Sequence, residues 1–142
     1  GALQNGATPQ SCLETAARIY PGVAPFVVPD FREIDFGRFE YQTYAELGGD
    51  ADYQAWIDSG GALPFPGGES REQFVARTVA AFDALLPQLR AKAAALVVHG
   101  GTIMAILSSR ATPARDYFDW QLPPGGLISA QWDGKTLLMT AE

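Results

Sequence analysis

The stretch AALVVHGGTIMAIL, residues 94–107, decides the expected fold. The run 94–98 is continuously apolar, which is typical of a strand covered on both faces in a parallel sheet. His99 and two glycines follow, and residues 103–107 predict a helix. Ligands of open α/β sheets bind beyond the carboxyl ends of strands, where a helix N-terminus attracts anions such as phosphate. His99 is therefore either part of an anion site or a histidine that satisfies a local hydrogen bond at a strand end.

Three further signals set the order of elements around this stretch. Ser11 is expected to cap a helix near the N-terminus, and Ser70 begins a capping box before a longer apolar stripe at helical spacing. Asp133 and Gly134 stand between two apolar runs and predict an antiparallel β-hairpin at the C-terminal end. Helices interspersed with strands predict a single α/β domain over residues 1–142.

Composition narrows the classes of function. The formal net charge is −6 and no basic block offsets it, which argues against nucleic acid as a partner. One cysteine cannot form an internal disulfide, and one cysteine with one histidine is too few for a zinc site built on those ligands. No metal or other cofactor is expected. No apolar run is long enough to cross a membrane, no signal peptide is visible after Gly1, and the lone thiol of Cys12 favours the cytoplasm.

Two other stretches carry groups that could do chemistry. In FREIDFGRFE, residues 31–40, acidic side chains stand among large apolar ones, and a carboxyl group held in such surroundings can act as a general acid. Taken alone, the stretch fits better a half-buried surface segment with arginine–carboxylate pairs. PFPGGES, residues 64–70, is a tight turn into a helix and taken alone fits a structural helix start.

Taken together and in this order, the stretches resemble the histidine phosphatases, the phosphoglycerate-mutase-like superfamily. The matching phrases are CLETA at 12–16, FREIDFGRFE at 31–40, PFPGGES at 64–70 and LVVHGGTIMAIL at 96–107. Each phrase is weak alone, but their joint occurrence over roughly residues 7–132 is specific. The chain is most similar to the α-ribazole phosphatases of the cobalamin pathway. The stretch between Glu33 and Glu69 is short for the mutase branch, which favours a phosphatase.

The resemblance implies a three-layer sandwich with a mostly parallel sheet and a phosphohistidine mechanism. In the family, a histidine in an Arg-His-Gly motif after the first strand accepts the phosphoryl group while a carboxylic acid protonates the leaving oxygen. His99 matches the second histidine of the phosphate pocket, Glu33 matches the acid, and Gly100 would lie against the phosphate. Ser11 stands where the family has its second arginine. The implied function is a phosphomonoesterase for a small phosphorylated metabolite, with α-ribazole 5'-phosphate as one candidate.

The sequence also departs from the family. It contains no Arg-His-Gly and no second histidine, so the nucleophile, its arginine and the first central strand are missing. In one explanation, upstream residues of the natural protein lie outside this chain; the absent initiator Met and the exposed strand edges that would otherwise result favour it. In the other, the chain is a degenerate, non-catalytic anion-binding module, which the serine at position 11 favours. A third possibility is a generic α/β domain whose motif matches are accidental.

Two expectations concern partners. A group of aromatic residues lies where the family builds its substrate lid, and its rings could stack on a planar leaving group or simply pack the lid. These residues are Phe39, Tyr41, Tyr53, Trp56 and Phe65. A chain that lacks its central strand could also associate as a homo-oligomer, which would cover the exposed edge.

Overall fold

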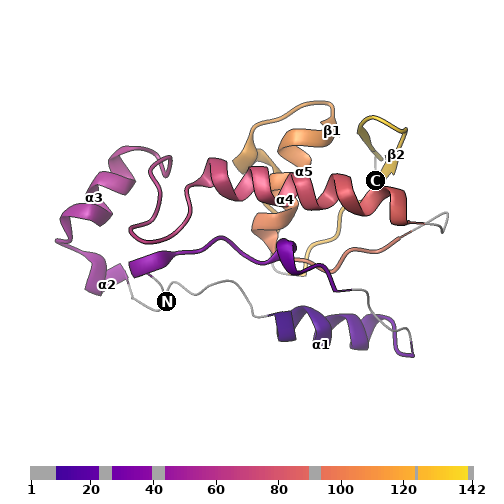
Figure 1. Ribbon diagram of the computed structural model, residues 1–142, viewed down its shortest axis with the longest axis horizontal. Helices are drawn as coiled ribbons and strands as arrows, with labels where there is room; N and C mark the ends of the chain where they lie inside the picture. The colour runs from indigo at the N-terminus through magenta and orange to yellow at the C-terminus, as the bar shows by residue number, and fades with distance from the viewer. Residues whose placement is uncertain (1–8, 23–26, 40–43, 90–93, 124, 141–142) are drawn as a thin grey trace.

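The computed structural model describes residues 9–22, 27–39, 44–89, 94–123 and 125–140. Its helices are α1 (Pro9–Ile19), α2 (Tyr44–Leu47), α3 (Ala51–Asp58), α4 (Arg71–Leu85) and α5 (Gly100–Arg110). Its strands are β1 (Ala111–Thr112), β2 (Ala130–Trp132) and β3 (Leu137–Met139). In Figure 1, α2 and α3 lie beyond the N-terminal end of α4, and the C-terminal hairpin lies near its other end. None of the described helices is long and apolar enough to cross a membrane.

Helix α4 organises the main core. The predicted capping box is confirmed, because the Ser70 hydroxyl accepts from the Gln73 N–H and the Gln73 side chain accepts from the Ser70 N–H. The α-helix ends at Leu85, two residues before Pro87, which cannot continue the hydrogen-bond ladder. Its buried face joins the segment before Glu33 and helix α5 in one apolar cluster, formed by Phe31, Phe82, Leu85 and Ile106.

Helix α5 begins directly after His99, which is its N-cap residue, with φ −73° and ψ 155°. The predicted helix over 103–107 is confirmed and begins three residues earlier, at Gly100. Thr102 is fully buried, and its hydroxyl donates to the Phe31 carbonyl at 3.0 Å. This bond ties the first turn of α5 to the segment that leads to Glu33.

The strand expected over 94–98 does not form in the structure. A strand exists only when a neighbouring backbone pairs with it, and these residues make no backbone hydrogen bond to another described segment. The apolar run indicates burial, but Leu96 remains 42% exposed. The space in front of it is the apolar pocket described below.

The C-terminal hairpin is confirmed. β2 and β3 pair antiparallel, with Trp132 opposite Leu137, and Gly134 makes the turn with φ +95°. β1 pairs parallel to β3, which gives a small mixed sheet in the order β1-β3-β2. The α/β class is therefore confirmed, whereas the three-layer sandwich with a mostly parallel sheet and the single domain over 1–142 stay predictions.

Helix α1 differs from its expected start. It begins at Pro9, so Ser11 lies inside the helix and is not its N-cap residue.

The segment between residues 36 and 65 forms a separate small aromatic core. Phe39, Leu47 and Phe65 are buried, and the Trp56 ring stacks on Phe65 with centroids 5.1 Å apart and on Tyr53 at 6.2 Å. These rings therefore pack against one another, as the packing interpretation expects. Tyr41, the fifth member of the predicted group, lies outside the described residues.

Candidate active site

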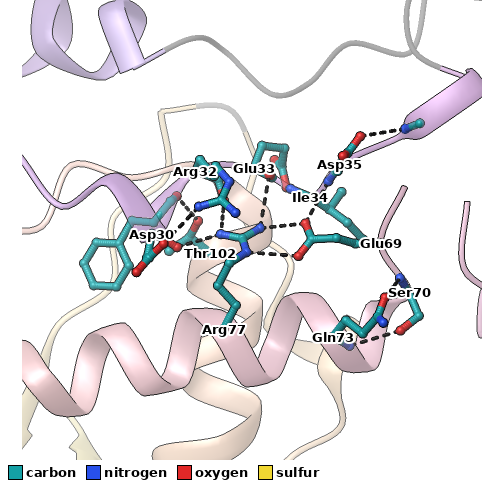
Figure 2. Close-up of polar contacts among 12 residues, drawn as sticks. Asp30, Arg32, Glu33, Ile34, Asp35, Glu69, Ser70, Gln73, Arg77 and Thr102 are labelled. Carbon is teal, nitrogen blue, oxygen red and sulfur yellow. Dashed lines mark hydrogen bonds and ion pairs between the residues drawn. The ribbon is translucent and has the colours of Figure 1, made fainter. Parts of the chain in front are cut away.

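Arg77 holds the segment that carries Glu33. Its guanidinium reaches from α4 to Glu69 with two hydrogen bonds, Nη2 to Oε1 at 2.7 Å and Nε to Oε2 at 3.0 Å (Figure 2). The same group donates to the carbonyls of Asp30 at 2.7 Å and Arg32 at 3.1 Å. One side chain thus holds the backbone that leads into Glu33, because a guanidinium offers five donors in a rigid fork.

Glu69 completes this clamp from the other side. Its Oε1 accepts from the Asp35 N–H at 2.9 Å, and its own N–H donates to the Asp35 carbonyl at 3.0 Å. Burial opposes the ionised form of Glu69, but the hydrogen bonds from Arg77 and Asp35 outweigh it and hold the pKa of this carboxyl below its usual range. Glu69 is therefore an ionised structural partner.

Two glycines let the segment of residues 35–38 and the turn of residues 66–69 lie in direct contact. A Cβ at Gly37 would clash with the Pro66 carbonyl, and a Cβ at Gly68 would clash with the Asp35 carbonyl. Gly37 also has φ +55°, which favours glycine. The Arg38 N–H donates to the Pro66 carbonyl at 2.7 Å across the contact. The two ends of the aromatic segment are thereby joined next to Glu33.

The Glu33 side chain lies against the first turn of α5. A Cβ placed on Gly101 would come within 2.6 Å of Glu33 Oε1, 3.3 Å of its Cδ and 3.4 Å of its Oε2. The same Oε1 accepts from the N–H of Ile34 at 2.9 Å. The carboxyl group is therefore next to the helix N-terminus, where the free N–H groups and the helix dipole favour negative charge.

His99 contacts Cys12 across the same end of α5. The Cys12 Sγ lies 3.8 Å from Nδ1 and 3.7 Å from Nε2 of the half-buried imidazole ring. Burial raises the pKa of the Cys12 thiol, and the negative charge of Glu33 raises it further. Cys12 is therefore a neutral thiol, and Glu33 is near enough to both α1 and α5 to act on it.

Tyr117 is a second titratable side chain that the charge of Glu33 affects. Burial raises the pKa of Tyr117 to about 12, the charge of Glu33 adds to the rise, and the charge of Arg71 opposes it. The Arg71 guanidinium lies over the rings of Tyr117 and Phe118, at 5.5 Å and 5.3 Å from their centroids. The charge of Glu33 thus acts on both the Cys12 thiol and the Tyr117 hydroxyl.

An apolar pocket of about 560 Å³ opens beside His99. It lies between α1, the segment at 27–32 and the run 94–98, and its lining includes Cys12, Val28, Leu96 and Val98. Arg32 is the one guanidinium in its described lining, and this exposed side chain pairs with Asp30 at 2.9 Å. The described lining therefore offers a phosphate no unpaired arginine.

The structure brings together three of the four residues singled out from the sequence. Glu33, His99 and Gly100 meet at the N-terminal end of α5, where a Cβ on Gly100 would face open space. Ser11 lies in α1, one residue before Cys12. Their roles in catalysis stay predictions. In the described part of the chain, no group of three or more His, Cys, Asp or Glu side chains could hold a metal ion.

Three residues of the site were missed by reasoning from the sequence alone. Arg77 lies next to the buried positions Phe74 and Thr78 of α4, and a charged residue beside the core stripe of a helix is a signal for a buried ion pair. Gly101 is a glycine inside a helix, which signals close approach of another group. Tyr117 carries no signal in the sequence, because only the fold brings it near Glu33.

Comparison with known proteins identifies the family of the chain. The family model of the histidine phosphatase superfamily (branch 1) matches residues 9–141. Among solved structures, the chain is 30% identical to TTHB049 from Thermus thermophilus, with TM-score 0.57, covering 92% of this chain and 68% of that one. It is also 30% identical to a phosphoglycerate mutase from the same organism, with TM-score 0.54, covering 85% of this chain and 63% of that one.

A third solved structure shares the fold at lower identity. It is an Escherichia coli K-12 protein described provisionally as an alpha-ribazole-5'-P phosphatase, with TM-score 0.63 and 19% identity, covering 70% of this chain and 51% of that one. No curated protein matches the chain. The chain thus spans about half to two thirds of the length of these three structures. The family match over nearly all of its residues shows that the chain belongs to the histidine phosphatase superfamily.

Proposed function

We propose that the protein that carries this chain is a phosphomonoesterase that works through a phosphohistidine. The observation that supports the proposal is the meeting of Glu33 and His99 at the N-terminus of α5, with Glu33 fixed from behind by Arg77. A helix N-terminus attracts phosphoryl oxygens, an imidazole can donate hydrogen bonds to them, and a carboxylic acid can protonate a leaving oxygen.

The proposed reaction has two steps. In the first, a histidine nitrogen attacks phosphorus, the phosphorus–oxygen ester bond breaks, and protonated Glu33 gives its proton to the leaving oxygen. In the second, water attacks phosphorus, its proton returns to the Glu33 carboxylate, the phosphorus–nitrogen bond breaks, and inorganic phosphate leaves. His99 and the N–H groups at Gly100 and Gly101 stabilise the charge on the phosphoryl oxygens in both steps.

The nucleophilic histidine is proposed to come from a strand upstream of Gly1 that ends in Arg-His-Gly. The apolar pocket supports this proposal, because its lining includes His99 and the run 94–98, which makes no backbone hydrogen bond to another described segment. A strand seated there would pair with that run and bring its last residues to the α5 N-terminus. It would also supply an arginine that is not paired with an acid, in addition to Arg32 of the described lining.

The proposed substrate is a small phosphorylated metabolite, and α-ribazole 5'-phosphate, from cobalamin biosynthesis, is the first compound to test. Support comes from the resemblance of the phrases around Tyr53–Ile57, Phe65–Ser70 and His99–Leu107 to the α-ribazole phosphatases. We further propose that the reaction takes place in the cytoplasm. The mutase alternative differs in the fate of the phosphoryl group, since a mutase returns it to the substrate and a phosphatase gives it to water.

The test is hydrolysis by the natural full-length protein and by the 142-residue chain, side by side. We expect the full-length protein to release phosphate from 4-nitrophenyl phosphate and from α-ribazole 5'-phosphate, and His99→Ala to abolish most of this release. Ser109→Ala, at an exposed position near the far end of α5, is the control and should keep full activity. Unchanged activity of His99→Ala would remove the site assignment.

The alternative is a non-catalytic anion-binding module on the same fold. Ser11 in place of the family's second arginine, and the pairing of Arg32 with Asp30 at the pocket, favour it. In that case the full-length protein binds phosphate without turnover. Phosphohistidine detected by mass spectrometry after incubation with substrate, on a residue other than His99, would rule this alternative out.

A further inference from the structure

Glu33 occupies space that any side chain at position 101 would take. The Glu33 Oε1 lies 2.6 Å from where a Cβ on Gly101 would stand, and real Cβ atoms essentially never come so close to another heavy atom. The Cδ and Oε2 atoms at 3.3 Å and 3.4 Å show that the whole carboxyl group, and not one oxygen, lies over this point.

The backbone conformation of the helix does not require glycine at this position. Gly101 is the second residue of α5 and has ordinary helical backbone, without the positive φ that favours glycine elsewhere in the chain. Alanine is the stronger helix former, so helix stability alone would favour a side chain here. Gly100 gives the comparison within the same turn, because a Cβ there would meet nothing within 4 Å.

The backbone of Glu33 cannot retreat easily from such a side chain. Its carbonyl accepts from Arg77 Nη2 at 3.4 Å, and its two neighbours are held by Arg77 and by the Ile34 N–H bond to the carboxyl group. A methyl group at position 101 therefore has to displace the carboxyl group and not the main chain. The displaced group would lose its place over the α5 N-terminus.

We propose that Gly101 is a positioning residue. Because it has no side chain, the Glu33 carboxyl group can pack on the first turn of α5 and point toward the leaving oxygen. This inference rests on the proposed phosphatase activity for its catalytic part. Its structural part, the packing of the Glu33 carboxyl group against Gly101, does not depend on that activity.

The first test is structural. Crystal structures of the full-length protein with Gly101→Ala should show the Glu33 carboxyl group moved off the α5 turn, with the main chain of residues 31–35 unchanged. Gly100→Ala should leave the Glu33 carboxyl group in place. A Gly101→Ala structure with Glu33 in its original position would overturn the proposal.

The second test uses the leaving group. A general acid matters for a poor leaving group such as an alkoxide and little for 4-nitrophenolate, which leaves without a proton. Gly101→Ala should therefore lower kcat/KM for an alkyl phosphate by about 10²-fold, the size of a lost general acid, and for 4-nitrophenyl phosphate far less. An equal loss on both esters would indicate general damage to the fold and would overturn the positioning role.

Two further substitutions, both at Glu33, separate an effect on the position of the carboxyl group from an effect on stability. Glu33→Gln should lower alkyl phosphate hydrolysis as much as Gly101→Ala does, and the double variant should be no worse than either, because both remove the same function. Glu33→Asp in the Gly101→Ala background shortens the side chain by one methylene and should restore part of the alkyl phosphate activity. If the wild-type protein hydrolyses neither ester, the proposed function fails. The crystal structures alone then decide whether Gly101 determines the position of the Glu33 carboxyl group.

Discussion

Replacing Arg77 by methionine tests whether one ion pair fixes the candidate site. Arg77 and Glu69 are mostly buried, with side chains 14% and 19% exposed. The substitution leaves the Glu69 carboxylate with the Asp35 N–H, and it removes the donor from three backbone carbonyls, those of Asp30, Arg32 and Glu33. Breaking a buried pair costs about 3–5 kcal/mol. Partial exposure reduces this, so we expect a loss of about 2–3 kcal/mol in the free energy of unfolding.

Urea denaturation of the wild type and the variant measures this loss, with Arg110→Met as the matched control. Arg110 also makes a two-bond pair, with Asp83, but there the side chains are 32% and 44% exposed, so removal should cost less than about 1 kcal/mol. The pKa of Glu69 is lowered in the folded protein, so the stability from the pair is present above the ordinary glutamate pKa and is lost as the pH falls through the lowered value. Equal losses for the two variants, or a difference that does not shrink in acid, would refute the reasoning.

Three other predictions follow from the described geometry. Because the pKa of Cys12 is raised, we expect iodoacetamide to alkylate its thiol slowly near pH 8 and faster in Glu33→Gln, with the rates measured by mass spectrometry. Equal rates in the two proteins would contradict the effect of Glu33 on the thiol. An ultraviolet titration should show a tyrosine with pKa about 12 that is missing in Tyr117→Phe. The contribution of Tyr117 to the stability of the folded protein is complete below about pH 10, and it is lost as the pH rises through the pKa of Tyr117 in the folded protein. Gly68→Ala should cost about 1–3 kcal/mol because its Cβ meets backbone, and Gly100→Ala, whose Cβ meets nothing within 4 Å, should cost less in the same denaturation assay.

Local signals in the sequence predicted local structure well. The Ser70 capping box and the Asp133-Gly134 turn each depend on atoms within a few residues, and each is present in the structure. Ser11 is not a cap because it lies inside α1, which already includes Pro9 and Gln10.

Long-range contacts were harder to predict. The apolar run 94–98 indicates burial, but a strand also needs a partner, and the run contains no information on whether a partner is present. The approach of Glu33 to His99 came from resemblance to the family and not from spacing. The bonds of Arg77 to the carbonyls of Asp30 and Arg32 depend on how α4 packs, which no pattern in one helix specifies.

The contact of Gly37 with Gly68 divides the chain into a part that is free to vary and a part that is not. Between these glycines the backbone leaves the Glu33 segment, builds its own aromatic core and returns to the same point. Because closing a longer loop between fixed ends costs little extra free energy, this excursion could be lengthened, shortened or exchanged with small effect on the position of Glu33. This module can therefore be replaced as a unit while the residues around the α5 N-terminus stay unchanged.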